Sequence, residues 1–150
     1  MVNLKQQLHA HCLAYAEERI DLATQAIHAA QASANEESKS SAGDKYETGR
    51  AMAQLEIEKH STQLAEAQKL KRVLEKIDPA QKSGSAQAGS LVITNQGNFY
   101  IAIAAAPFTL EGKTYFPVSP VSPIAQKLLG LKRGDPFTFN GKDFVIGEIR

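Results

Sequence analysis

The sequence has few of the features that mark exported, disulfide-bonded or membrane-spanning proteins. Its 150 residues include one cysteine, Cys12, which cannot form a disulfide within the chain and is typical of a reducing compartment. The longest apolar run, residues 99–108, has about ten residues, whereas a membrane-spanning helix needs about 18. Lys5, His9 and His11 interrupt the region where a secretory signal would need an apolar core. We therefore expect a cytoplasmic protein that does not span or bind a membrane.

Signs of catalysis and of strong electrostatic binding are also missing. The sequence contains no nucleophile elbow, no phosphate-binding P-loop and no His-Glu-x-x-His metal motif. Its 17 basic and 16 acidic residues nearly balance, so no strong attraction to free nucleic acid or to a membrane surface is expected. These observations argue against a self-sufficient enzyme and against sequence-specific DNA binding.

Proline and aromatic residues are scarce in the first half of the chain. All six prolines lie at or after Pro79, and only two of the ten aromatic residues precede it. A segment with so few large side chains cannot build an ordinary globular core, but it can form long helices. The composition predicts a helical domain over residues 1–78, a linker of small residues over 79–90 and a globular domain over 91–150.

The apolar residues of the first segment follow the pattern of a coiled coil. Between Asn3 and about Ala34 they recur at alternating spacings of three and four residues, which predicts a helix that packs closely against a partner. This first stripe consists of Leu13, Ala16, Ile20, Ala23, Ile27, Ala30 and Ala34. A second stripe follows Gly43 and consists of Ala53, Ile57, Leu64, Ala67, Leu70, Leu74 and Ile77.

The connection between the two predicted helices is short and polar. Residues 35–43 contain no large apolar side chain and read as a turn, while Asp78-Pro79 ends the second helix because proline disfavours helical geometry in the preceding residue. Two helices of similar length with a short connection fold back on each other. We expect an antiparallel hairpin with its tip near residues 36–50.

The C-terminal segment reads as three β-hairpins and one short helix. The turns lie at residues 95–98, 111–113 and 140–142, between runs of β-branched and aromatic residues. Ser122 is placed to cap a helix that has Pro123 at its first position. The segment predicts a small α+β domain in which one helix packs on an antiparallel sheet.

This layout resembles the bacterial GreA/GreB transcript-cleavage factors of RNA polymerase over essentially the whole chain. The segment Ser119-Pro-Val-Ser-Pro-Ile-Ala-Gln-Lys-Leu-Leu-Gly-Leu-Lys-Arg-Gly-Asp135 looks like the family's C-terminal signature, and Phe144-Val-Ile-Gly-Glu-Ile looks like its closing strand. The resemblance implies an α+β fold of two domains, an antiparallel coiled-coil hairpin followed by a small FKBP-like domain. It also makes Ser122, Pro123 and Ile124 candidates for contact with a partner.

The predicted tip carries part of a second family motif. Family cleavage factors have Gly-Asp-x-x-Glu-Asn-Ala-Glu-Tyr there, and Gly43, Asp44 and Glu47 match its first residues. The next four residues are Thr-Gly-Arg-Ala, so Arg50 stands where the family has a second glutamate. The resemblance implies a hairpin that enters the secondary channel of RNA polymerase and acts on the 3′ end of backtracked nascent RNA. It makes Asp44 and Glu47 the catalytic and metal-binding residues, with Mg²⁺ held in the polymerase active site and no cofactor bound by this chain alone.

The chemistry of this carboxylate pair has two interpretations. Asp44 and Glu47 are one helical turn apart and could hold a weakly bound Mg²⁺ for hydrolysis by two metal ions. The same pair at a helix start also forms a capping box, in which both carboxylates accept backbone N–H groups. The altered tip also allows a factor that binds the polymerase channel and inhibits or competes without stimulating cleavage.

Other groups of residues suggest weaker hypotheses. His9, His11 and Cys12 resemble a metal cluster, but positions two apart do not share a helix face. A run of basic residues could be plain surface or a contact with polymerase or RNA; it consists of Lys69, Lys71, Arg72 and Lys76. An FKBP-like isomerase or chaperone could use the aromatic residues as a ligand groove, although core packing is their commoner role. These residues are Phe99, Tyr100, Tyr115, Phe116, Phe137, Phe139 and Phe144.

Overall fold

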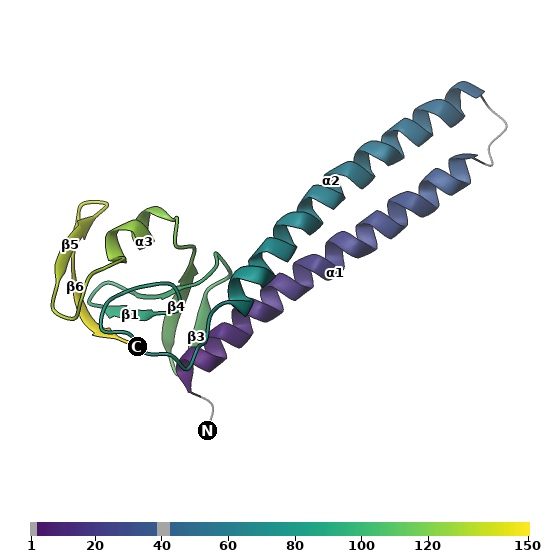
Figure 1. Ribbon diagram of the computed structural model, residues 1–150. Helices are drawn as coiled ribbons and strands as arrows, with labels where there is room; N and C mark the ends of the chain where they lie inside the picture. Colours follow the sequence, from purple (N-terminus) through teal and green to yellow (C-terminus); the bar gives the residue numbers. More distant parts are fainter. Residues whose placement is uncertain (1–2, 39–42) are drawn as a thin grey trace. The chain divides into compact units, whose positions relative to one another are not determined.

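The computed structural model describes residues 3–38 and 43–150, with the backbone alone for residues 37–38 and 43–47. It confirms an α+β protein, in which two long helices are followed by a six-stranded sheet and a short third helix (Figure 1). Helix α1 spans Leu4–Ser38 and helix α2 spans Gly43–Glu75. The first helix therefore continues through Asn35–Ser38, which the sequence assigned to a turn, and the second ends three residues before Asp78.

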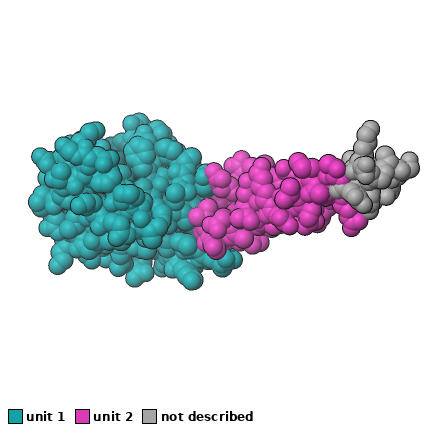
Figure 2. All heavy atoms as spheres, turned by 90° about the horizontal axis from the view of Figure 1, so that it is seen from above, with its two compact units in different colours: residues 1–15, 72–150 teal, residues 16–71 magenta. Residues whose placement is uncertain are grey.

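The chain forms two compact units, shown in different colours in Figure 2. One consists of residues 1–15 and 72–150, and the other of residues 16–71. Both long helices contribute to both units, so the division falls within α1 and α2 and not in the segment 79–90. We call the first the sheet unit and the second the hairpin unit.

In the hairpin unit, two helical segments run antiparallel and pack along a narrow seam. Lys71 Nζ lies 3.6 Å from Glu17 Oε1, which places the end of the α2 segment beside the start of the α1 segment. Every residue of the two predicted stripes within this unit is buried or half-buried. Among the described residues of the unit, the buried side chains are alanines, which are small enough to let two helices approach closely. They are Ala16, Ala23, Ala53 and Ala67.

His60 also occupies the seam, although neither apolar stripe includes it. Its side chain is 19% exposed. The ring has a polar partner on each nitrogen: Glu56 Oε2 lies 3.2 Å from Nε2, and Gln63 Oε1 lies 2.7 Å from Nδ1. Both partners belong to the same helix, which explains how a polar ring is tolerated between the two helices.

The sheet unit contains six strands in the order β3-β4-β2-β1-β6-β5. The strands are β1 (Leu91–Thr94), β2 (Asn98–Ile101), β3 (Phe108–Leu110), β4 (Lys113–Val118), β5 (Pro136–Phe139) and β6 (Lys142–Ile149). The three predicted hairpins are confirmed, because β1 with β2, β3 with β4 and β5 with β6 each pair antiparallel.

The prediction of an antiparallel sheet was wrong, because β2 and β4 pair in parallel. Each of these is the second strand of its own hairpin, so their adjacency makes the sheet mixed. In the register, Asn98 lies opposite Tyr115 and Ile101 lies opposite Val118. Turn residues identify each hairpin locally, but they carry no information on which strand of one hairpin lies beside the next.

Helix α3 (Pro123–Leu128) covers one face of the sheet. Its cap is the predicted one: Ser122 Oγ accepts a hydrogen bond from Ala125 N at 3.3 Å, and Pro123 stands at the start of the helix. Ile124 and Leu128 on α3 belong to one core cluster with sheet residues such as Ile101. The neighbouring Tyr100 points to the opposite face, since successive residues of a strand alternate.

Part of the predicted linker, residues 79–90, is buried in the sheet unit. Ala86 is 2% exposed and belongs to the core cluster around α3. Its backbone donates to Leu131 O and accepts from Gly130 N, both at 2.8 Å. Ser90 is also 2% exposed. Small side chains suit this segment because its backbone lies close to the residues that follow α3.

Candidate functional site

The predicted tip carboxylates lie at the beginning of α2. The helix starts at Gly43, so Asp44 and Glu47 fall within its first turns, one turn apart. Their side chains lie outside the described residues. The described residues nearest to them along the helix are polar or small, and Thr48 and Arg50 are exposed. This end of the helix therefore presents hydrophilic groups.

The residues at the start of α3 have mainly structural contacts. Ser122 Oγ donates to Ser119 O at 2.6 Å as well as accepting from the helix, so both hydroxyl functions are engaged. Ile124 is 9% exposed and packs in the core. Pro123 is exposed, and Val121 beside it is 81% exposed. Of the three candidate partner-binding residues, Pro123 has its side chain at the surface.

The histidines and the cysteine near the start of α1 do not converge on one point. His9 Nδ1 lies 2.9 Å from the hydroxyl of Tyr100. His11 Nε2 lies 2.7 Å from Ala106 O, so this nitrogen carries the proton and donates to the carbonyl. Among residues 3–38 and 43–150, no group of three or more His, Cys, Asp or Glu side chains is arranged to hold a metal ion.

Burial disfavours the charged forms of three side chains in this region, Cys12, His9 and Tyr100. Burial raises the pKa of the Cys12 thiol to about 12, so the side chain is an inert apolar group and not a nucleophile. Burial also lowers the pKa of His9, against the opposing effect of a hydrogen bond to the Leu74 backbone, and raises the pKa of Tyr100. The His9–Tyr100 pair therefore joins α1 to β2 through a neutral hydrogen bond. The two residues are 91 positions apart, and no local pattern in the sequence indicates their contact.

The basic residues at the end of α2 differ in their surroundings. Lys69 Nζ lies 3.3 Å from Glu66 Oε1 on the same helix, and Lys71 pairs with Glu17 across the seam. These two contacts support the interpretation of plain surface for Lys69 and Lys71. Lys76 instead lines a pocket of the sheet unit.

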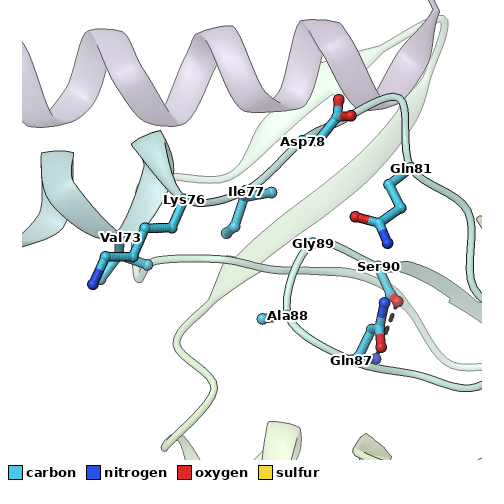
Figure 3. A pocket seen from close by; sticks show the side chains of 9 residues that line it. All are labelled: Val73, Lys76, Ile77, Asp78, Gln81, Gln87, Ala88, Gly89 and Ser90. Carbon is cyan, nitrogen blue, oxygen red and sulfur yellow. Dashed lines mark hydrogen bonds between the residues drawn. The ribbon is translucent and has the colours of Figure 1, made fainter.

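This pocket has a volume of about 270 Å³ and lies between the end of α2 and the turn at residues 87–90 (Figure 3). Val73, Ile77 and Ala88 make its apolar part, while Lys76 and Asp78 bring opposite charges to it. Figure 3 marks the bond from Gln87 N to Ser90 Oγ, which measures 3.1 Å. Ser90 therefore holds the turn that forms one wall of the pocket.

Gly89 is required in that wall. Its φ is +91°, a conformation that L side chains rarely adopt, and an added Cβ would lie 3.0 Å from Ile77 Cγ2. Its N–H donates to Ile101 O at 2.6 Å and joins the turn to β2. The backbone thus closes on Ile77, which leaves a shallow apolar depression with a polar margin.

Most of the aromatic side chains belong to the core of the sheet unit. Tyr100 is 0% exposed, and Tyr115 and Phe144 are each 6% exposed. Phe137 stacks on Phe144 with ring centroids 4.7 Å apart. Phe116 differs, because it is 41% exposed. These positions support core packing for the aromatic residues.

No protein-family model, no curated protein and no solved structure matches this chain. In the described parts of the chain, neither long helix is apolar enough over its length to cross a membrane.

Proposed function

We propose that the chain is a GreA/GreB-like transcription elongation factor of the cytoplasm. It binds RNA polymerase, inserts the tip of its helical hairpin into the secondary channel and stimulates cleavage of backtracked RNA. Asp44 and Glu47 are the residues that act on the polymerase-bound Mg²⁺, and the nascent RNA 3′ end is met only within the complex. Residues 91–150, which form part of the sheet unit, correspond to the FKBP-like domain of that family.

The observation that carries this proposal is the construction of the hairpin unit. Two antiparallel helices pack along a seam of alanines, and Asp44 is the second residue of the second helix. The α1 segment of this unit, residues 16–38, is about 35 Å long at 1.5 Å per residue. A narrow helix pair of this length with acidic residues at its closed end can reach a site that a globular domain cannot enter.

Hydrolysis of RNA by two metal ions would require only one or two Mg²⁺ ligands from this chain. Mg²⁺ keeps several of its waters and is usually bound by one or two carboxylates together with phosphate oxygens. Two carboxylates one helical turn apart could therefore retain a second ion beside the metal that polymerase holds. In such a pair of metals, one ion activates the attacking water and both stabilise the in-line displacement at phosphorus. The polymerase and its RNA supply the remaining ligands, so the factor is not an enzyme by itself.

Arg50 favours a second candidate function. It is exposed on the second turn of α2, at a position where the family motif carries a glutamate. A positive charge there opposes the capture of a cation but not entry into the channel. The alternative is a factor that binds in the secondary channel and inhibits or competes without stimulating cleavage.

Transcript cleavage by stalled, backtracked RNA polymerase tests the proposal. We expect added protein to accelerate cleavage, and the double variant Asp44→Asn with Glu47→Gln to lose most of this acceleration while still binding polymerase. Glu58→Gln, which removes an exposed carboxylate further along the same helix, is the matched control and should behave as the wild type. Binding with slowed elongation and no cleavage would select the inhibitor, and absence of binding would contradict both functions.

A deletion separates docking from activity. Removal of residues 36–50 takes away the tip, and polymerase binding should survive if the sheet unit supplies the docking contacts. Loss of binding would place the main contact on the hairpin end instead.

A further inference from the structure

The sheet unit contains a second pocket, which basic side chains line from three separate segments. It has a volume of about 300 Å³, at the small end of the range of roughly 300–1,000 Å³ for small-molecule sites. Asn3 and Lys5 come from the start of α1, Lys82 from the segment after α2, and Arg150 from the end of β6. The other lining residues are Pro79, Ala80, Glu148 and Ile149.

The side chain of Lys5 is almost fully buried, and a hydrogen bond fixes the position of its ammonium group. The residue is 6% exposed, and its Nζ donates to Gln81 O at 2.6 Å. An ammonium group has three N–H donors, so this bond leaves Lys5 able to donate to a ligand as well. Burial lowers the pKa of Lys5. The negative charge of Asp78 opposes this lowering, and the positive charge of Lys82 lowers the pKa further. Lys5 and Lys82 both line the pocket, so two ammonium groups belong to the same cavity.

The single acidic side chain among the lining residues is already engaged. Arg150 forms a fork on Glu148, with Nε 2.9 Å from Oε1 and Nη2 3.3 Å from Oε2. Neither Lys5 nor Lys82 has a carboxylate partner among the ion pairs of the described residues. Three basic groups and one acidic group give the lining side chains a net charge of +2, and Asp78, outside the lining, offsets part of the charge of Lys5.

We propose that this pocket binds the phosphate group of a small phosphorylated molecule. A phosphate monoester carries a charge of about −1.5 to −2 at neutral pH and has three strong acceptor oxygens, which match two lysines without carboxylate partners. A carboxylate ligand would bring only one negative charge and two acceptor oxygens. Lysine binds phosphate as a point charge, and a ligand oxygen can take the donors that Gln81 O leaves on Lys5. Pro79, Ala80 and Ile149 offer an apolar surface to the organic part of the ligand.

Phosphate binding at this site is independent of the proposed action on RNA polymerase, because no residue of the hairpin unit lines the pocket. The experiment titrates the full chain with inorganic phosphate and with ribose 5-phosphate, and follows heat release and backbone amide shifts. We expect saturable binding with shifts at residues 3, 5, 80, 82 and 150. Ribose alone, and sodium chloride at equal ionic strength, should have no saturable effect.

Two lysine variants distinguish binding at this pocket from a general effect of surface charge. Lys82 is exposed, so Lys82→Gln should fold normally and weaken binding about tenfold or more, as expected for the loss of one charge-assisted hydrogen bond. Lys113→Gln removes another exposed lysine, at the start of β4, and should leave binding unchanged. Equal effects of both variants, or no saturable binding by the wild type, would overturn the proposal.

The phosphate can belong to a free metabolite or to the end of a nucleic acid, and a second binding experiment distinguishes these two sources. A short single-stranded oligonucleotide with a 5′ phosphate is compared with the same oligonucleotide without it. Tighter binding of the phosphorylated oligonucleotide than of ribose 5-phosphate, lost in Lys82→Gln, assigns the site to nucleic-acid ends. Equal or weaker binding assigns it to small phosphorylated molecules.

Discussion

The two compact units bury side chains of very different size. The hairpin unit encloses alanines, such as Ala23 and Ala67, along one seam. The sheet unit encloses much larger side chains, among them Tyr100 and Leu128, between α3, the sheet and the first turns of α1. Burial free energy rises with the apolar area removed from water, so the sheet unit concentrates its stability in a few residues.

The two units should also differ in which substitutions destabilise them. A helix pair with a narrow buried seam is stabilised by close packing along its whole length, because each single contact contributes little free energy. A unit of this kind opens locally more easily than a packed sheet. Substitutions that create cavities should therefore matter most in the sheet unit, and substitutions that force the helices apart should matter most in the hairpin.

The largest expected effect is cavity formation in the sheet unit. Leu128→Ala removes a fully buried side chain from the cluster around α3, and should lower the free energy of unfolding by about 2–5 kcal/mol. Leu55→Ala on the hairpin, where the side chain is 58% exposed, should change it by less than about 0.5 kcal/mol. Urea denaturation followed by circular dichroism measures both. Similar losses would remove the distinction between the units.

The next effect is overpacking of the helical seam. Ala67→Leu inserts a large side chain at a position that is 3% exposed, and should destabilise the hairpin by about 1–3 kcal/mol because the helices must separate. Ala65→Leu makes the same substitution at an exposed position of the same helix and serves as the control. Hydrogen exchange should show faster opening confined to residues 16–71 in the first variant. Unchanged exchange there would mean that the seam is loosely packed.

A smaller effect is expected at the cap of α3. Ser122→Ala removes the oxygen that accepts from Ala125 N, and should cost about 1 kcal/mol. Ser122→Thr keeps the hydroxyl and should recover most of the loss. Thermal unfolding compares the three proteins. An alanine variant as stable as the wild type would show that the Ser122 cap contributes nothing to stability.

The smallest effect is a pH dependence in the sheet unit, because His9 is only half-buried. Burial lowers the pKa of His9 in the folded state below its unfolded value of about 6.5, so the unfolded chain binds more protons between the two values. The contribution of His9 to stability is therefore complete above about pH 6.5 and declines as the pH falls below it. The urea midpoint measured from pH 5 to 8 should fall less steeply for His9→Gln than for the wild type. Equal slopes would show that His9 is equally easy to protonate in both states.

Local patterns predicted the elements that depend on neighbours in the sequence. The helical stripes, the three hairpins and the Ser122–Pro123 helix start follow from spacing, turn residues and capping, all of which act within a few residues. The polar seam residue His60 was missed because its partners, Glu56 and Gln63, satisfy it from the same helix. A histidine with hydrogen-bonding residues four before and three after it is the signal that could have indicated this arrangement.

Contacts between distant residues could not be predicted in the same way. The β2–β4 pairing, the burial of Ala86 against Leu131 and the His9–Tyr100 bond join segments that no periodicity relates. The phosphate pocket has the same origin, since Lys5, Lys82 and Arg150 are brought together from three parts of the chain. The candidate tip residues, by contrast, were found from a motif alone.

By itself the sequence determined which segments become helix or strand and which stripe of each long helix is buried, because these depend on residue type at short spacing. The tertiary structure alone decided the order of the strands, the division of both long helices between two units and the gathering of basic groups around one pocket. The physical reason is that such arrangements follow from the shape and burial of whole surfaces, and those surfaces exist only once the chain has folded.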